Sequence, residues 1–103
     1  MTQRTGFVLH VRPDRIDDYV EAHRNVWPEM RAALRSAGIR NYTIFRAGNQ
    51  VFGYFEADDL RAAERYLAEQ EVCARWQDAM AELLEARVRD GGPEPLEQIF
   101  RLD

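Results

Sequence analysis

Two short apolar segments in the middle of the chain, separated by a tight turn, restrict its fold more than any other feature of the sequence. The segments cover residues 39–45 and 50–56, and Gly48-Asn49 between them is a typical turn sequence. Both segments are rich in the β-branched and aromatic residues that favour strands. We therefore expect a central β-hairpin, with the rest of the chain arranged on either side of it.

A helical pattern precedes the hairpin and covers residues 14–37. Acidic residues stand at its beginning, where the positive end of the helix dipole favours them. Pro28 lacks an amide donor and disfavours helical geometry at the residue before it, so we expect a break near residues 25–27. Gly38 follows the last periodic residue and is the expected end of the helix.

A second helical pattern follows the hairpin and covers residues 60–85. It is rich in Ala, Leu, Glu and Arg, which are favourable in helices. Asp58-Asp59 offers an N-cap for a helix that begins at Leu60, and we expect a joint near residues 70–72. This part of the chain is therefore expected to form two helices.

The two ends of the sequence are predicted to supply outer strands. Residues 5–11 are apolar and end before Pro13, residues 90–95 have the composition of a loop, and residues 98–102 read as a final strand. The resulting order is β-α-β-β-α-β within a single domain of residues 1–103. This is the ferredoxin-like arrangement of the α+β class, with the helices on one face of a four-stranded antiparallel sheet.

The predicted strands are apolar on both faces, although helices are expected to cover only one of them. In the segment 50–56, for example, Phe52 and Tyr54 alternate with Val51 and Phe55. A monomer would expose an aromatic patch of the kind that usually marks an interface. We therefore expect a homodimer in which two sheets pack face to face as a dimeric α+β barrel.

Composition excludes several classes of partner. The chain has 14 basic and 18 acidic residues, a net charge of −4, and so lacks the basic surface that holds a phosphate backbone of nucleic acid. No segment approaches the ~20 apolar residues that cross a membrane. The one cysteine and the absence of a signal-peptide pattern indicate a cytoplasmic protein.

Three residues spaced four apart give the first indication of chemistry. Tyr19, His23 and Trp27 would lie on one apolar face if the segment is helical. An imidazole with an ordinary pKa of about 6.5 is the natural acid/base group near neutral pH. His23 is therefore a candidate catalytic residue, and the alternative is a hydrogen-bonded histidine of the core.

Other reactive groups give little support for a metal or a cofactor. His10, His23 and Cys73 are too few and too scattered to form a metal-ligand pattern, so we expect no metal site. The glycines at positions 91 and 92 do not open a helix after a strand and lack both nucleotide-binding fingerprints. We therefore expect no cofactor, and no catalytic role for His10 or Cys73.

Several spaced motifs occur in one order along nearly the whole chain. They are Phe7-Val8 with Pro13-Asp14, Tyr19-x3-His23-x3-Trp27-Pro28-Glu29, Asn41-Tyr42-x-Ile44, Val72-Cys73-x-Arg75-Trp76, and Phe100 near the end. In these motifs the chain resembles the L-rhamnose mutarotases, dimeric ferredoxin-like enzymes that interconvert the α and β anomers of a 6-deoxy sugar. The resemblance implies that His23 is the catalytic proton donor, that Tyr19 and Tyr42 contact the sugar, and that Trp76 lines the pocket.

The chain departs from this family at Gln77, where a second tryptophan commonly follows the one matching Trp76. Glutamine offers less apolar area and adds a donor and an acceptor, so Gln77 is expected to give a roomier and more polar sugar pocket. Two alternative functions remain open. One is a cofactor-free oxygenase on the same dimeric α+β frame, and the other is a non-catalytic module that binds a small ligand.

Overall fold

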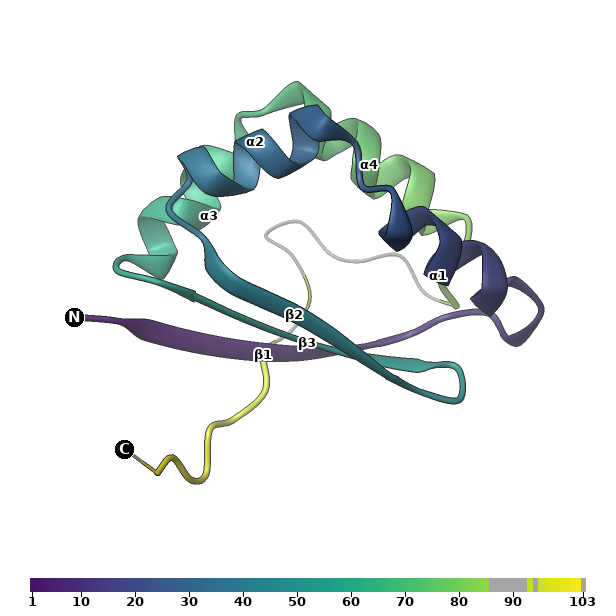
Figure 1. Cartoon of the computed structure of the whole chain (residues 1–103), viewed down its shortest axis with the longest axis horizontal. Coiled ribbons are helices and arrows are strands. Elements are labelled where there is room, and N and C mark those ends of the chain that lie inside the picture. Colours follow the sequence, from purple (N-terminus) through teal and green to yellow (C-terminus); the bar gives the residue numbers. More distant parts are fainter. Residues whose placement is uncertain (86–92, 94, 103) are drawn as a thin grey trace.

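The protein is described here by a computed structural model that covers residues 1–85, 93 and 95–102. These residues form an α+β structure with a three-stranded antiparallel sheet and four α-helices (Figure 1). The elements are β1 (Gln3–His10), a short 3-10 turn η1 (Pro13–Arg15), α1 (Ile16–Arg24), α2 (Pro28–Ser36), β2 (Arg40–Ala47), β3 (Gln50–Ala57), α3 (Leu60–Ala68) and α4 (Glu71–Ala81).

The predicted central hairpin is confirmed. β2 and β3 pair antiparallel on either side of a turn in which Gly48 has a φ of 61°, a conformation that glycine adopts at little cost. β1 pairs with the other edge of β3, so the strand order is β1-β3-β2. β3 is therefore the central strand. The predicted first strand is confirmed, though it spans Gln3–His10 rather than residues 5–11.

An irregularity in β2 changes which face of the sheet its residues occupy. Arg40 pairs with Glu56 and Thr43 pairs with Tyr54, so two residues of β2 lie opposite a single residue of β3. Asn41, one of the two, has a φ of 52°, which only a few residue types tolerate. This bulge places Arg40 on the same face of the sheet as Thr43 rather than on the opposite one.

The predicted break in the first helical segment is also confirmed. Helix α1 ends at Arg24 and α2 begins at Pro28, with Trp27 extended at φ −52° and ψ 134°. Pro28 stands at the first position of α2, where its missing amide hydrogen has no cost. Gly38 has a φ of 89° and ends this helical segment as expected.

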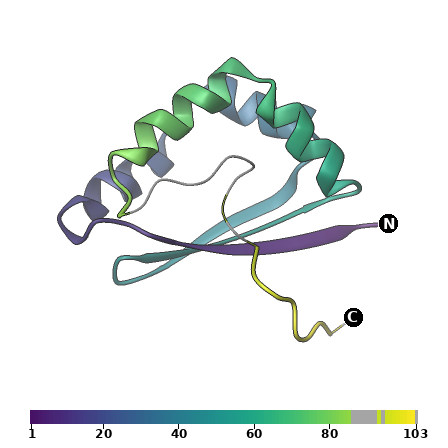
Figure 2. The same cartoon turned by 180° about the vertical axis from the view of Figure 1, so that it is seen from behind.

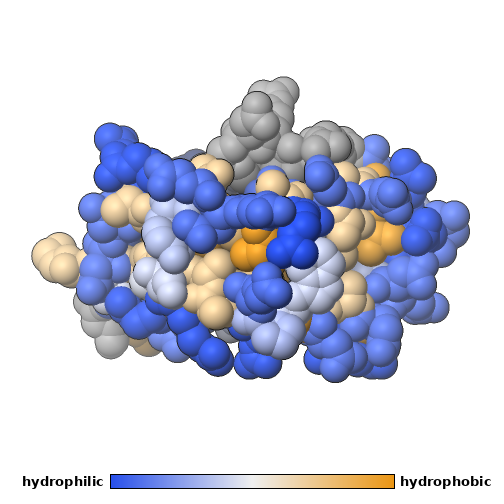
Figure 3. Space-filling view, turned by 90° about the horizontal axis from the view of Figure 1, so that it is seen from above, coloured by the Kyte–Doolittle hydropathy of each residue, from blue (hydrophilic) through white to orange (hydrophobic). Residues whose placement is uncertain are grey.

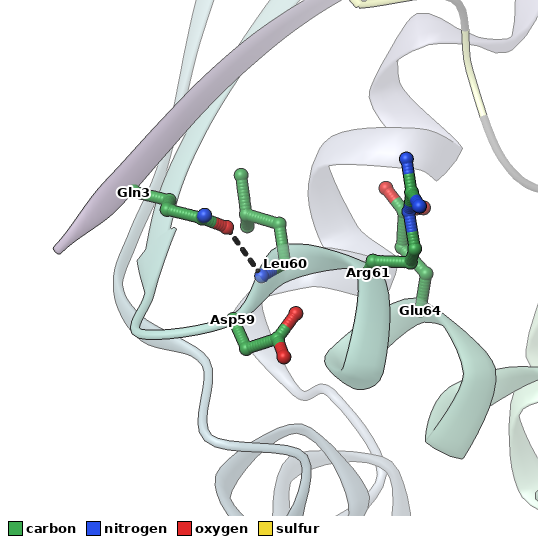
Figure 4. Close-up of a pocket in the computed structure, with 5 residues that line it drawn as sticks. All are labelled: Gln3, Asp59, Leu60, Arg61 and Glu64. Atoms are coloured by element: carbon green, nitrogen blue, oxygen red, sulfur yellow. Dashed lines mark hydrogen bonds between the residues drawn. The ribbon is translucent and has the colours of Figure 1, made fainter. Parts of the chain in front are cut away.

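The second helical segment divides at residues 69–70, close to the predicted joint, and α4 ends at Ala81 rather than near residue 85. Asp59 caps α3 as expected, because its Oδ1 accepts a hydrogen bond from the Ala62 amide at 3.0 Å. The Gln3 side chain accepts another from the Leu60 amide at 2.8 Å (Figure 4). These bonds occupy two of the free amides at the start of α3, and the Gln3 bond joins β1 to α3.

The predicted fourth strand at residues 98–102 is wrong. The chain makes one bridge to β1, between Pro95 and Phe7, and one backbone hydrogen bond, from the Leu96 amide to the Gly6 carbonyl at 2.7 Å. Pro95 cannot donate a hydrogen bond, which interrupts pairing at the free edge of β1. The segment then leaves the sheet and ends below it (Figures 1 and 2). Of the predicted loop, residues 90–92 and 94 lie outside the described residues.

All four helices lie over one face of the sheet and form an arch above it (Figures 1 and 2). The buried core is divided between the two ends of this arch. One cluster gathers around Val51 at the start of β3, and the other around Ala57 at its end. The middle of the sheet, between the two clusters, faces the cavity described below.

The opposite face of the sheet carries no helix. Phe45 and Phe52 are paired in register on this face and are 68% and 37% exposed, and Val8 pairs with Phe52 from β1. The helical side, in contrast, is largely hydrophilic, with hydrophobic atoms visible between its helices (Figure 3). Within the described part of the chain, no helix has the length and apolar character needed to cross a bilayer.

Candidate functional site

A cavity of about 1270 Å³ lies between the helices and the sheet. Its lining comes from all four helices above and from residues of β1, β2 and β3 below. All five site residues predicted from the sequence line this cavity, although they are distributed over 59 positions of the chain: Tyr19, His23, Tyr42, Trp76 and Gln77.

His23 is held in one orientation by the helix that carries it. Its Nδ1 lies 2.8 Å from the backbone carbonyl oxygen of Tyr19, one turn earlier in α1. A carbonyl only accepts hydrogen bonds, so Nδ1 carries the hydrogen and, in the neutral ring, Nε2 keeps its lone pair. The half-buried imidazole therefore has a defined tautomer with Nε2 available as a proton acceptor.

Burial lowers the pKa of His23 from its ordinary value of 6.5, because removing the ring from water penalises its charged form. The hydrogen bond to the Tyr19 carbonyl acts in the opposite direction and is the smaller effect. His23 is consequently neutral at pH 7. In that state it can accept a proton from a bound molecule and return it afterwards.

Tyr19 forms one wall beside the imidazole. The two rings stack with centroids 4.3 Å apart and planes 30° apart, as expected for aromatic residues one helical turn apart. Tyr19 is almost completely buried, and burial raises the pKa of its phenol to about 12. Tyr19 is therefore neutral at pH 7, and its hydroxyl can donate or accept a hydrogen bond but cannot act as a base there.

Trp76 reaches the same imidazole from α4. Its ring centroid lies 5.4 Å from that of His23 and the two planes are nearly perpendicular, at 81°. Cys73, one turn earlier in α4, is buried and also lines the cavity, and burial raises the pKa of its thiol. It is therefore a protonated, apolar part of the wall at pH 7 rather than a nucleophile.

Tyr42 faces His23's helix from the sheet, where it belongs to an aromatic cluster with Phe7 and Phe55. Its ring centroid is 6.3 Å from that of Phe7 and 5.1 Å from that of Phe55. Although Tyr42 is 40% exposed by area, loss of hydration raises the pKa of its phenol, and the nearby Tyr19 phenol raises it further. Tyr42 is therefore neutral at pH 7, and its hydroxyl can donate or accept a hydrogen bond.

Comparison with known proteins relates this cavity to a family. A family model described as L-rhamnose mutarotase matches residues 4–102 of the chain. The chain belongs to the L-rhamnose mutarotase family. The L-rhamnose mutarotase of Pectobacterium carotovorum is 38% identical, with 97% of this chain and 98% of that protein covered. That of Bacillus subtilis is 33% identical, with 98% and 99% covered.

A solved member of the L-rhamnose mutarotase family has the same architecture. The crystal structure of the L-rhamnose mutarotase from Formosa agariphila superposes with a TM-score of 0.79 at 27% sequence identity, and the match covers 98% of this chain and 99% of that one. The α+β arrangement described above is therefore shared with a mutarotase at low sequence identity.

Gln77, predicted from the sequence to make the sugar pocket roomier and more polar, lies on α4. It is exposed yet borders the cavity beside Trp76, even though neighbours on a helix point about 100° apart. Both residues can border it because the cavity extends along α4, where Cys73, Ala74, Met80 and Ala81 also line it. Gln77 therefore lies where it can contact a ligand, and the cavity wall is more polar there than a tryptophan would make it.

Several residues of this mutarotase-family cavity were missed by the sequence analysis. The floor residues Phe7 and Phe55 share the inner face of the sheet with Tyr42, and the alternation of strand residues could have identified them. Trp27, predicted to share the face of Tyr19 and His23, is not among the described residues that line the cavity. The break before Pro28 takes it out of α1, and it contacts Trp76 instead.

Metal binding is not supported by any grouping of side chains in residues 1–85, 93 and 95–102. These residues include no cluster of three or more His, Cys, Asp or Glu placed to hold an ion. What the described part of this mutarotase-family cavity offers is a neutral imidazole with a free Nε2, two phenols and an indole. These groups can exchange protons and bind hydroxyl groups.

Proposed function

We propose that this chain is an aldose 1-epimerase of the L-rhamnose mutarotase type, which interconverts the α and β anomers of a 6-deoxy sugar. One observation carries the proposal: His23 is neutral, fixed through Nδ1, and has its Nε2 available among aromatic residues of a cavity large enough for a monosaccharide. The names of the relatives support L-rhamnose as the substrate.

The geometry fits the chemistry of mutarotation. In this reaction the sugar ring opens at the anomeric carbon, the resulting aldehyde rotates, and the ring closes again. The anomeric hydroxyl and the ring oxygen are bonded to the same carbon, so one nitrogen can serve both. Nε2 of His23 accepts the hydroxyl proton as the bond between the anomeric carbon and the ring oxygen breaks, and then delivers that proton to the ring oxygen. The reverse steps, after rotation of the aldehyde, give the other anomer.

No cofactor is needed for these reaction steps, because every proton and electron pair that leaves one atom of the sugar returns to another. A positioned acid/base group of this kind typically contributes ~10²–10⁴-fold to the rate. The role of proton donor to the ring oxygen is therefore filled by the imidazolium that forms during the reaction, and not by a resting charged histidine.

The other site residues suit the binding of a monosaccharide. The Tyr19 and Tyr42 hydroxyls can donate or accept hydrogen bonds with sugar hydroxyls. Trp76 supplies a flat apolar surface of the kind that packs on the C–H face of a pyranose. Gln77 adds a donor and an acceptor at the border of the cavity. We assign catalysis to His23 and substrate binding to these four residues.

We further propose that the chain works as a homodimer of single ferredoxin-like domains, packed through the helix-free face of the sheet as a dimeric α+β barrel. The exposed Phe45 and Phe52, with Val8 beside them, support this assembly because such apolar patches usually mark interfaces. The strand order β1-β3-β2, with the C-terminal segment at the free edge of β1, supports the ferredoxin-like assignment. A cytoplasmic location fits the single free thiol.

Saturation-transfer NMR of L-rhamnose tests the function directly, because it measures exchange between the two anomers at equilibrium. The wild type should accelerate exchange above the spontaneous rate, and His23→Ala should lose that acceleration by ~10²-fold or more. The matched control is His10→Ala, since His10 is an exposed histidine on β1. A folded wild type that binds the sugar without accelerating exchange would instead indicate a binding module, and oxygen consumption with an aromatic substrate an oxygenase.

A further inference from the structure

Trp27 occupies an unusual position between two helices. Asn25 caps the end of α1 and Pro28 opens α2, and Trp27 between them has an extended backbone. This conformation is the one that a residue before proline prefers. The break therefore directs the indole of Trp27 out of the line of α1 and toward α4.

In this position Trp27 packs against the indole of Trp76. The two ring centroids are 5.1 Å apart and the planes are perpendicular, at 89°. Trp76 in turn lies against His23, at 5.4 Å. Trp27 thus stands behind Trp76, which lines the cavity, while Trp27 is not among the described residues that line it.

A charged pair on the outside of the protein lies against Trp27. The guanidinium carbon of Arg75, on α4, lies 5.9 Å from the centroid of the Trp27 ring. The same guanidinium binds the carboxylate of Glu29, on α2, at 3.1 Å. Both groups are largely exposed, so this ion pair adds little stability by itself. Its effect is to fix the orientation of Arg75 over the indole and to join α2 to α4.

We propose that Trp27 is a positioning residue for Trp76, and that Arg75 and Glu29 hold it there from the outer surface. The inference rests on the proposed function, because its purpose is to keep Trp76 in contact with both His23 and the sugar. The four residues form one continuous series of contacts from the surface to the imidazole. Trp27 is not among the described residues that line the cavity, and it acts through Trp76.

Two consequences follow if Trp27 is replaced by a smaller side chain. Trp76 loses the surface behind it and can rotate away from the cavity, which weakens sugar binding. It also moves from the imidazole, so water reaches His23 and the pKa of His23 rises toward its ordinary value. The other titratable side chains that line the cavity in the described residues are Tyr19, Arg24, Arg31, Arg35, Tyr42, Glu64 and Cys73. The substitution removes none of these groups.

The first test compares Trp27→Leu with the conservative Trp27→Phe in the full-length protein. Trp27→Leu should raise KM for anomer exchange of L-rhamnose by about 10-fold, since a ~1 Å misplacement of a site residue can cost up to ~10²-fold and Trp76 is displaced only indirectly. It should also raise the pH midpoint of kcat/KM and the NMR-measured pKa of His23. Trp27→Phe retains an aromatic ring and should recover most of both losses.

The second test keeps both tryptophans and removes only the guanidinium. Arg75→Gln should raise KM by a smaller factor, about 2- to 3-fold, as expected for an exposed charge. It should also change the near-UV circular dichroism, which reports the fixed packing of aromatic side chains. Arg65→Gln is the matched control, because Arg65 is an exposed arginine on α3.

The outcomes separate this inference from the proposed function. If the wild type accelerates exchange and Trp27→Leu keeps the wild-type KM and pH midpoint, the positioning role is wrong. If the wild type does not accelerate exchange, the proposed function is wrong, and the pKa of His23 in the variants still decides whether Trp27 positions Trp76. If Trp27→Leu does not fold, Trp27→Phe and Arg75→Gln decide the question, and unchanged circular dichroism in Arg75→Gln would overturn it.

Discussion

The ring of Phe7 on β1 lies directly over Gly53, its partner in register on β3. A Cβ atom at position 53 would clash with the Cζ end of this ring. The absence of a side chain at Gly53 thus lets Phe7 lie low on the inner face of the sheet. The buried Phe7 ring is part of the cavity floor, where it contacts Tyr42.

Gly53→Ala should therefore change both stability and the cavity. Phe7 must move, and overpacking of this kind typically costs ~1–3 kcal/mol of unfolding free energy, which urea denaturation measures. The displaced ring should also raise KM for the sugar. Gly48→Ala is the control, because its positive φ makes alanine unfavourable while it has no neighbour within 4 Å. It should lose stability with an unchanged KM, and the same result for Gly53→Ala would contradict the role of the Phe7 ring.

Tyr19→Phe should reduce anomer exchange less than His23→Ala. The substitution removes the phenol oxygen but keeps the backbone carbonyl that fixes Nδ1 of His23, and it keeps the stacked ring. We expect kcat to fall by about 10-fold or less, corresponding to the loss of one hydrogen bond to the sugar. Steady-state exchange rates over a range of sugar concentrations measure the change. A loss equal to that of His23→Ala would make the phenol part of the proton transfer.

The pH dependence of kcat/KM should show one acidic limb with its midpoint below 6.5. The neutral form of His23 is the active base, and burial lowers its pKa, so activity is constant near pH 7 and falls as the pH drops through that lowered pKa. No alkaline limb from Tyr19 is expected in this range, because its pKa is raised to about 12. Exchange rates corrected for spontaneous mutarotation provide the measurement, and a midpoint at or above 6.5 would contradict the assignment.

The lowered pKa of His23 also makes folding stability depend on pH. Its pKa is lower in the folded than in the unfolded chain, so the unfolded state binds more protons as the pH falls below 6.5. The free energy of unfolding should decrease in this interval, and His23→Ala should remove part of the decrease. Urea denaturation of both proteins at several pH values measures it.

Gln77→Trp should narrow the range of sugars that the protein accepts. Glutamine can hydrogen-bond an extra exocyclic hydroxyl, whereas an apolar wall distinguishes single carbons by only ~1–3 kcal/mol. The wild type should therefore tolerate L-mannose relative to L-rhamnose better than the variant does. Exchange rates of both sugars in both proteins decide the point, and equal ratios would show that Gln77 has no influence on specificity.

Phe45→Lys should separate the proposed dimer. A charge on the helix-free face would be buried at the interface without a partner, which is costly, and Phe45 is already 68% exposed in the single chain. Sedimentation at micromolar concentration should show a dimer for the wild type and a 12.0 kDa monomer for the variant. The matched control is Tyr66→Lys on the helical side, which should remain a dimer. A monomeric wild type would remove the proposal.

Local signals account for the parts of the fold that could be predicted from the sequence. The break at Pro28, the end at Gly38 and the cap at Asp59 each depend on the chemistry of one residue and its neighbours. The fourth strand depended on pairing with distant β1, and periodicity within residues 98–102 could not show that Pro95 interrupts that pairing.

In the candidate site, too, local relationships could be predicted from the sequence and long-range ones could not. His23 and its relation to Tyr19 could be inferred from a spacing of four residues, because one turn of helix brings them together. Tyr42 and Trp76 were identified only by resemblance to a family, since each reaches the cavity through contacts between elements distant in the sequence. The same reason explains why the position of Phe7 over Gly53 and the contact of Trp27 with Trp76 could not be predicted.

The bulge at Asn41 divides β2 into two parts in which the alternation of side chains between the two faces is offset by one residue. After the bulge, even-numbered residues such as Tyr42 and Ile44 face the cavity. Before it, the even-numbered Arg40 lies on the outer face, as its pairing with Glu56 requires. Side-chain alternation has a period of two, so regular pairing of β2 with β3 that kept all residues but lost the bulge would exchange the faces of every residue on one side of Asn41. Tyr42 would turn outward or Arg40 would turn inward. A single extra residue thus allows Arg40 to lie on the outer surface and Tyr42, only two positions later, to lie in the sugar cavity.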